Sequence, residues 1–204
     1  MKHIVIATHN KAKIRDLMSG FRQLEKHGFT LHTLEELHIT AEPEETGKTF
    51  EENSLLKAQY YAELCNMAAI ADDGGLTIDA LHGEPGVYSR RWTGAESTDE
   101  VLIAYTLKRM KGIPDENRTA QMQTCLCYYD PQTGKHILIR EKVDGHITEE
   151  ANPGWTRGYP YRAVFTVDRF HKFYDDLTEE EHAQINHRFM AIDKLSKAII
   201  DSHS

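Results

Sequence analysis

Two short runs of consecutive apolar residues, at 4–7 and 67–71, constrain the fold of this chain more than any other feature. Continuous apolar runs of this length are typical of strands that are buried within a sheet. Apolar side chains then recur at helical spacing over residues 11–26, so the first unit is predicted to be a strand, a turn and a helix. These features predict an α/β fold with a mixed, twisted central sheet flanked by helices.

The remaining elements follow from turn and capping residues. Further strands are expected at 30–34, 120–129, 136–143 and 163–167. Ser/Thr-x-x-Glu capping boxes at Thr49, Ser97 and Thr178 each predict the start of a helix. The last helix is expected to continue as one apolar stripe made of Ile185, Phe189, Ile192 and Ile199. We predict a single domain over residues 1–204, with a β-rich second lobe at roughly 120–165.

Composition limits the classes of function. The formal net charge of −8 over 204 residues argues against a general nucleic-acid binder or a protein that binds anionic membranes. Three cysteines, Cys65, Cys125 and Cys127, are an odd number and fit a reducing compartment rather than a disulfide scaffold. The N-terminus has no signal-peptide pattern, and no apolar run approaches the roughly 20 residues that span a bilayer. We expect a soluble cytoplasmic protein.

Two adjacent carboxylates, Asp72 and Asp73, follow the second apolar run and are themselves followed by Gly74 and Gly75. We expect the strand to end here in an exposed turn, because paired glycines let the backbone turn tightly or approach a ligand closely. Carboxylates in such a place are well suited to hold a hard cation such as Mg²⁺. The alternative is that both aspartates cap the next element or lie in a solvated turn.

The turn after the first predicted strand carries residues that suit a phosphate group. Thr8 and Asn10 lie in the turn, and Lys13 lies in the first turn of the following helix. The N–H groups and the dipole of a helix start attract anions, and Lys13 adds a point charge. In the second helix, Asn53 and Lys57 share one face. The alternative is that Asn10 only caps the helix and that Lys13 is solvated.

Three motifs together resemble the inosine triphosphate pyrophosphatase family. They are Thr8-x-Asn10-x-x-Lys13; Glu44-x-Thr46-Gly47 with Phe50, Asn53, Lys57 and Ala58; and, after the aspartates, Gly83-x-Pro85-Gly86-x-Tyr88-Ser89-x-Arg91. The resemblance covers roughly the first half to three-fifths of the chain well and the rest loosely. It implies hydrolysis of ITP, dITP or XTP to the monophosphate and pyrophosphate, with Mg²⁺ as cofactor. It also implies a homodimer whose nucleotide lies in a cleft between two lobes.

The same resemblance assigns roles to individual residues. Glu44 and Asp73 would hold the metal, with Glu45 as a less expected substitute for Glu44. Lys13 and either Asp72 or Asp73 would be catalytic, the aspartate by activating water. The implied substrate contacts are Thr8, Asn10, Lys13, Asn53, Lys57, Gly74, Tyr161, His187 and Arg188. The last two would reach the oxo-bearing edge of the purine.

The resemblance fails in the loop that precedes the last predicted strand. The family's Gly-Phe-Gly-Tyr-Asp-Pro matches residues 158–163, where Pro160 replaces a glycine and Arg162 replaces the aspartate. Further on, His182 replaces a lysine and Asn186 replaces a serine. Two readings remain open: the loop has drifted and reads the same base, or selectivity for ITP and XTP over GTP and ATP is weaker than the family pattern gives.

Two other functions remain open from the sequence. One is a pyrophosphatase that acts on a different modified nucleotide, and the other is a nucleotide-binding module that has lost turnover. A panel of nucleoside triphosphates with pyrophosphate detection separates these alternatives.

Overall fold

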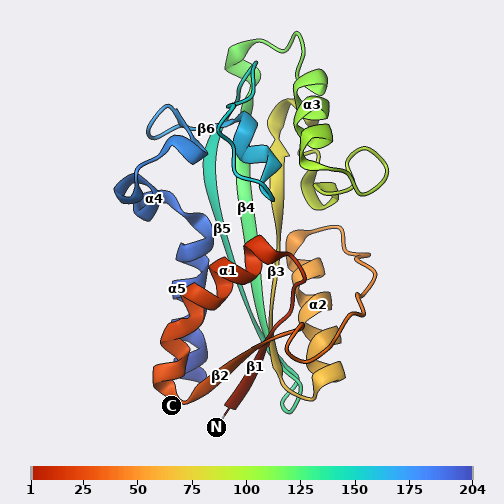
Figure 1. Ribbon diagram of the computed structural model, residues 1–204, viewed down its shortest axis with the longest axis vertical. Coiled ribbons are helices and arrows are strands. Elements are labelled where there is room, and N and C mark those ends of the chain that lie inside the picture. The colour runs from red at the N-terminus through yellow and green to blue at the C-terminus, as the bar shows by residue number, and fades with distance from the viewer. Residues whose placement is uncertain (1, 204) are drawn as a thin grey trace. The chain divides into compact units, whose positions relative to one another are not determined.

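The computed structural model describes residues 2–203 and has the α/β architecture that was predicted (Figure 1). Seven strands form one sheet in the order β2-β1-β3-β4-β5-β6-β7. Strand β1 is parallel to β2 and β3, whereas β6 is antiparallel to β5 and β7, so the sheet is mixed. The strands are β1 (Lys2–Ile6), β2 (Phe29–Thr33), β3 (Ala68–Ile78), β4 (Thr119–Asp130), β5 (Lys135–Ile147), β6 (Phe165–Val167) and β7 (Lys172–Phe173).

Helices accompany the sheet, and side-chain caps start several of them. The α-helices in the described residues are α1 (Lys11–Gly20), α2 (Phe50–Cys65), α3 (Asp99–Arg109), α4 (Glu179–Ile185) and α5 (His187–Ser202). Thr49 and Thr178 are the N-caps of α2 and α4, as predicted, whereas α3 is capped by Thr98 rather than Ser97. The first helix is shorter than expected, because a 3₁₀ helix, η1 (Phe21–His27), replaces its second half.

The chain divides into two compact units. The first comprises Met1–Asp73, Thr124–Glu141 and His187–Ser204, and the second comprises Gly74–Gln123 and Lys142–Asn186. The divisions therefore fall inside strands β3, β4 and β5. The expected β-rich lobe at 120–165 stays a prediction.

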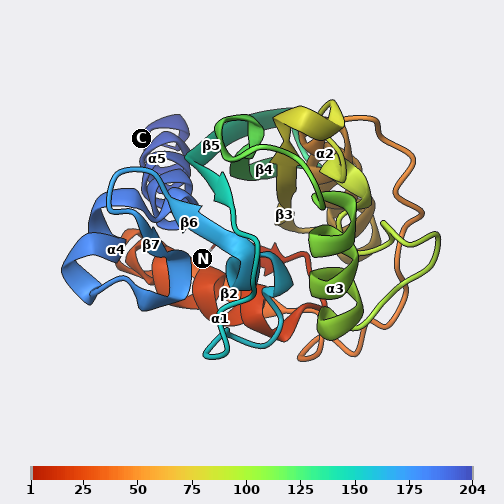
Figure 2. The same cartoon turned by 90° about the horizontal axis from the view of Figure 1, so that it is seen from above.

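In the first unit the sheet is buried on both faces, which explains the unbroken apolar run of β1. Ile4 and Ile6 belong to a core that includes Ile70 and residues of α1 and α5, and these two helices pack against each other (Figure 2). Val5 belongs to a second core on the opposite face, with Ala71 and residues of α2. Alternate residues of β1 and β3 therefore face different helices.

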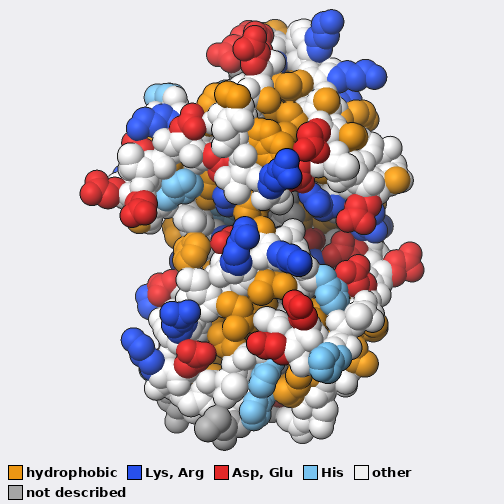
Figure 3. Space-filling model, viewed as in Figure 1, with side chains coloured by type: hydrophobic (Ala, Val, Ile, Leu, Met, Phe, Trp, Pro, Cys, Tyr) orange, Lys and Arg blue, Asp and Glu red, His pale blue; other side chains and the backbone are white. Residues whose placement is uncertain are grey.

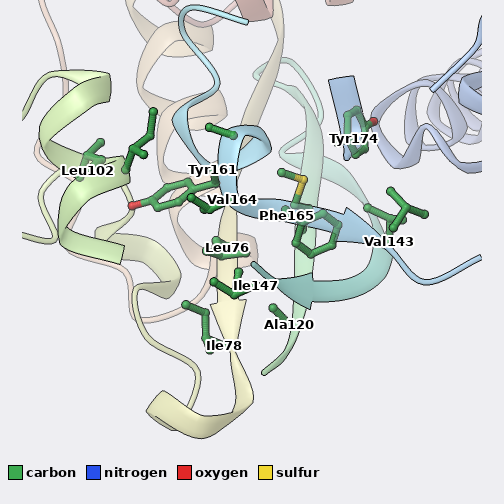
Figure 4. Close-up of a cluster of buried hydrophobic side chains, with 14 of the residues drawn as sticks. Leu76, Ile78, Leu102, Ala120, Val143, Ile147, Tyr161, Val164, Phe165 and Tyr174 are labelled. Atoms are coloured by element: carbon green, nitrogen blue, oxygen red, sulfur yellow. The ribbon is translucent and has the colours of Figure 1, made fainter. Parts of the chain in front are cut away.

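The second unit has its own hydrophobic core, to which its strands and the helix η5 contribute. Leu76 and Ile78 of β3 pack with Tyr161, Val164 and Phe165, as the close-up of these side chains shows (Figure 4). Tyr161 and Val164 come from the short 3₁₀ helix η5 (Pro160–Val164), which leads into β6.

The prediction that the strand ends at the two aspartates is wrong. Strand β3 continues through Asp72, Asp73, Gly74 and Gly75, and neither glycine has a positive φ. Glycine is needed for close approach instead, because a Cβ atom at Gly75 would lie 2.0 Å from Ser89 Oγ. The aspartates are consequently buried, with exposed fractions of 1% for Asp72 and 7% for Asp73.

The prediction of one continuous last helix is also wrong. Helix α4 ends at Ile185, and Asn186 adopts extended backbone angles before α5 begins at His187. The apolar stripe is correspondingly broken, since Ile185, Ile192 and Ile199 are buried but Phe189 is 40% exposed.

Among residues 2–203, no helix is both long enough and apolar enough to cross a membrane. Acidic and basic side chains are interspersed over the face drawn in the space-filling view (Figure 3).

Candidate active site

The turn between β1 and α1 is organised by the two polar residues that the sequence singled out. Asn10 is the N-cap of α1, and its Oδ1 accepts hydrogen bonds from the backbone N–H groups of Ala12 (2.9 Å) and Lys13 (3.2 Å). Thr8 Oγ1 accepts from the Asn10 N–H at 3.2 Å. Asn10 therefore does cap the helix, and the cap fixes the turn that presents Lys13.

This turn lies at the carboxyl end of β1, next to the two aspartates. The parallel register pairs Ile6 with Ile70, so residue 72 of β3 is level with Thr8. The carboxyl ends of parallel strands are where ligands bind in open α/β sheets. The sequence-predicted residues of β1, α1 and β3 thus meet at one end of the sheet in the first unit.

Asp72 lies on the face of β3 that carries Ile70, and its partners Thr124, Arg188 and Lys13 lie on that side. Thr124 Oγ1 donates to its Oδ1 at 2.7 Å, Arg188 Nε donates to its Oδ2 at 3.1 Å, and Lys13 Nζ lies 3.4 Å from the same Oδ2. Its side chain has no exposed surface. Burial alone would raise the pKa of Asp72, but Lys13 and Arg188 outweigh burial and hold that pKa well below its usual value.

Lys13 is held by the same residue. Its Nζ lies 3.4 Å from the Asp72 backbone oxygen as well as 3.4 Å from the carboxylate, and the side chain keeps 17% of its surface exposed. Burial lowers the pKa of Lys13 more than Asp72 raises it. A lysine held in this way at a helix start is placed to meet an anion.

Asp73 faces the opposite side of the sheet, toward α2. Lys57 Nζ donates to Asp73 Oδ1 at 3.0 Å and to Glu45 Oε1 at 2.7 Å. Asp73 Oδ2 is buried, and among the described residues it has no hydrogen-bond partner. Burial raises the pKa of Asp73 despite Lys57. Burial alone would lower the pKa of Lys57, but Asp73 and Glu45 outweigh burial and raise that pKa.

The donor set around Asp73 fits a hard divalent cation, although no group of three acidic, histidine or cysteine side chains is assembled in the described residues. The fit rests on the unpartnered Oδ2 of Asp73, because a buried carboxylate oxygen without a donor is costly unless a cation or a water meets it. Oxygen ligands of this kind suit Mg²⁺. Glu44 is exposed, and it is Glu45 that shares Lys57 with Asp73.

Asn53 serves the loop that carries these glutamates. It is buried in α2, and its Oδ1 accepts from the Gly47 N–H at 2.8 Å. A Cβ atom at Gly47 would lie 2.5 Å from that oxygen, so only glycine fits here. Asn53 thereby fixes the end of the loop 41–47.

The two residues that open α5, His187 and Arg188, are both buried. Besides its bond to Asp72, Arg188 Nη1 lies 3.4 Å from Asp16 Oδ2 on α1. The structure thus brings Arg188 to the same carboxylate as Lys13.

The other predicted site residues belong to the second unit. Gly74 follows Asp73 directly in β3. Tyr161 is buried, and its hydroxyl donates to the Ser89 carbonyl oxygen at 2.5 Å. Burial also raises the pKa of Tyr161. The four residues that were expected to depart from the family pattern, Pro160, Arg162, His182 and Asn186, lie in this unit as well.

Sequence reasoning missed two partners of the charged cluster. Thr124 interrupts an otherwise apolar row made of Met122, Leu126 and Tyr128, and this lone polar residue was the available signal. Asp16 follows Lys13 by three residues, which puts both on one face of α1.

Comparison with known proteins extends the family resemblance seen in the sequence motifs over nearly the whole chain. The model of the Ham1 family matches residues 4–198, including the C-terminal part where the motifs gave only a loose resemblance. A Bacillus subtilis protein named dITP/XTP pyrophosphatase is 40% identical over 201 residues, covering 98% of each chain. A Thermoanaerobacter pseudethanolicus protein of the same name is 36% identical and covers 97% of this chain and 96% of its own.

Solved structures agree with these sequence matches. The Staphylococcus aureus Ham1 protein aligns over 100% of both chains, with a TM-score of 0.83 and 33% identity. A structure described as nucleoside-triphosphatase, dITP/XTP pyrophosphatase, from Mycobacterium abscessus aligns over 95% of this chain and 98% of its own, with a TM-score of 0.77 and 30% identity.

Proposed function

The chain belongs to the Ham1 family, and on that basis we propose that it is a dITP/XTP pyrophosphatase. In this reaction a water oxygen bonds to the α-phosphorus, the bond from that phosphorus to the bridging oxygen of the β-phosphate breaks, and pyrophosphate leaves. The observation that carries the proposal is a cluster of buried charges beside the carboxyl end of β1 and the middle of β3, in a chain 40% identical to such an enzyme.

Two cations of this cluster, Lys13 and Lys57, would bind and orient the triphosphate. Lys13 stands at the start of α1 and keeps part of its surface exposed, while Lys57 stands between two carboxylates. Arg188, which is expected to reach the oxo-bearing edge of the purine, is held on Asp72, so its guanidinium is fixed in place. Phosphoryl transfer depends chiefly on positioning and on neutralising charge, and fixed cations supply both. The resemblance assigns Thr8, Asn10 and Asn53 to substrate contacts. Thr8 and Asn10 fix the turn between β1 and α1, and Asn53 fixes the end of the loop 41–47, so these residues would position those segments for the substrate.

Asp73 is the better candidate for the residue that activates water. Both oxygens of Asp72 are engaged by Thr124, Lys13 and Arg188, and its side chain is closed to solvent. Asp73 has one buried oxygen, Oδ2, without a donor among the described residues. We infer that Asp73 Oδ2 accepts the proton of the attacking water, and that Asp72 holds cations rather than water.

Mg²⁺ completes the proposal. Glu44 and Asp73 would hold the ion, and Glu45 is the alternative that the contacts of Lys57 favour. When bound, Mg²⁺ neutralises phosphate charge and lowers the pKa of a coordinated water.

Further parts of the proposal come from the resemblance. We expect a homodimer in the cytoplasm, with two lobes that hold the nucleotide in a cleft. Size-exclusion chromatography with light scattering measures the oligomeric state.

A substrate panel tests the proposed activity. Purified protein is incubated with dITP, XTP, dGTP and dATP in Mg²⁺, and pyrophosphate and inorganic phosphate are detected separately. The expected products are the monophosphate and pyrophosphate, with dITP and XTP turned over fastest. Release of inorganic phosphate, or the absence of turnover with every nucleotide, would contradict the proposal.

A further inference from the structure

Arg162, which stands where the family has aspartate, lies between two aromatic rings of the second unit. Its guanidinium carbon is 3.8 Å from the centroid of the Tyr159 ring and 4.5 Å from that of Tyr174. A guanidinium is planar and weakly hydrated, so it stacks on aromatic faces more readily than an ammonium group does. Only 15% of the Arg162 side chain is exposed.

Asp175 supplies the opposite charge and joins Arg162 to the start of the same loop. Arg162 Nη1 lies 3.6 Å from Asp175 Oδ1, while Asp175 Oδ2 accepts from the backbone N–H of Thr156 at 2.7 Å. This carboxylate is 6% exposed. Next to it, Asp176 Oδ1 accepts from Asn152 Nδ2 at 2.8 Å. The segment 174–176 therefore holds the loop 152–162 at several points.

The far end of this loop is tied to the start of α3 and, through Ser89, to β3. The Gly158 N–H donates to Asp99 Oδ2 at 2.6 Å, and the Tyr161 hydroxyl donates to the Ser89 carbonyl oxygen. Ser89 Oγ in turn donates to the Gly86 carbonyl oxygen at 2.7 Å and accepts from the Leu76 N–H at 3.3 Å. The loop thus connects, through Tyr161 and Ser89, to the backbone three residues beyond Asp73.

We propose that Arg162 is a positioning residue for the reaction: with Tyr159, Tyr174 and Asp175 it clamps the loop 152–162, and the loop fixes Tyr161 against Ser89. We refer to these four residues as the Arg162 clamp. The role rests on the proposed pyrophosphatase function. Because Asp175 offsets its charge and two rings cover it, Arg162 holds the loop and does not read the base.

The clamp also accounts for a second departure from the family pattern. His182, where the family has lysine, packs on the same ring, with centroids of His182 and Tyr174 5.0 Å apart. A lysine there would put two permanent cations around Tyr174, and a histidine that is neutral avoids this repulsion. Arginine at 162 and histidine at 182 are therefore compatible, as are the family's aspartate and lysine.

Kinetics of matched variants tests the clamp. Arg162→Met and Asp175→Asn each break it, Arg162→Lys keeps the charge without the planar stack, and Arg157→Met makes the same change at an exposed arginine of the same loop. We expect KM for dITP and XTP to rise roughly tenfold in the first two, with kcat within about twofold of wild type. Arg162→Lys should be intermediate, and Arg157→Met should match wild type.

Three results would overturn the proposal. A lowered Tm with unchanged KM would make the role structural only. A changed ratio of kcat/KM between dITP and dGTP would mean that Arg162 reads the base. A rise in KM in Arg157→Met as large as that in Arg162→Met would show that the effect does not depend on the Arg162 clamp.

Two further measurements separate the clamp from the activity itself. Amide hydrogen exchange over 152–162 needs no turnover, and it should be faster in Arg162→Met and Asp175→Asn but not in Arg157→Met. Unchanged exchange refutes the clamp, whereas a wild type without turnover refutes only the proposed function. In the double variant Arg162→Asp/His182→Lys, the change in log KM should be smaller than the sum of the changes in the two single variants. Additive changes in log KM would contradict the coupling between residues 162 and 182.

Discussion

Neutralising Asp72 should mainly cost stability. The buried carboxylate of Asp72 meets Thr124, Lys13 and Arg188, so Asp72→Asn leaves two cations against a neutral amide. Removing one partner of a buried ion pair costs roughly 3–5 kcal/mol. The lower end, about 3 kcal/mol, applies because asparagine still accepts from Thr124 and Arg188 keeps Asp16. At about 2–4 °C per kcal/mol for a chain of this length, Tm should fall by about 6–12 °C.

Neutralising Asp73 should mainly cost activity. Lys57 keeps Glu45 as a partner in Asp73→Asn, and an amide N–H₂ group can replace the oxygen that has no donor. The free energy of unfolding should therefore change by no more than about 1 kcal/mol. The same variant loses the proposed proton acceptor, so kcat for dITP should fall at least roughly 100-fold.

Thermal scans and steady-state kinetics on the two variants and the wild type, in the same Mg²⁺ buffer, give the comparison. The expected pattern is crossed, with the larger loss of Tm in Asp72→Asn and the larger loss of kcat in Asp73→Asn. The reverse pattern would refute the assignment of the two aspartates.

Three further outcomes are expected. Lys13→Ala should raise KM for dITP at least about tenfold, because the triphosphate loses a fixed cation; a change in Tm alone would mean that Lys13 only stabilises the fold through Asp72. Gly75→Ala should lower the free energy of unfolding by about 1–3 kcal/mol through its contact with Ser89 Oγ, and adding Ser89→Ala should restore part of it in denaturant titrations. Burial and, secondarily, Arg162 lower the pKa of His182, so the unfolded chain binds more protons and Tm should fall as pH drops through about 6.5. His182→Gln should flatten that fall, and an unchanged slope would contradict it.

The apolar runs predicted the buried strands of the first unit correctly, because a strand covered on both faces needs apolar side chains at every position. The glycine pair misled the prediction, since glycine serves turns and close approach equally well. The partner that decides between these uses is Ser89, which is 14 residues beyond Gly75 and meets it only in the folded chain. The break between α4 and α5 at Asn186 could not be predicted either, because the sequence around it has no proline or glycine to mark a helix end.

The two aspartates could not be distinguished while they were expected in a turn. Within a continuous strand, adjacent side chains point to opposite faces, so Asp72 joins the α1 and α5 side while Asp73 joins the α2 side. Their different partners follow from this alternation. The motifs did identify the family and most of the charged cluster, but they did not include Thr124 or Asp16.

Turnover of dITP in ¹⁸O-labelled water tests the central claim most directly, because it locates the phosphorus that water attacks. Mass spectrometry of both products after a single turnover shows where the label enters. Attack at the α-phosphorus, with Asp73 as the base, predicts ¹⁸O in the monophosphate and none in pyrophosphate. Label in pyrophosphate, or in inorganic phosphate, would contradict the proposed reaction.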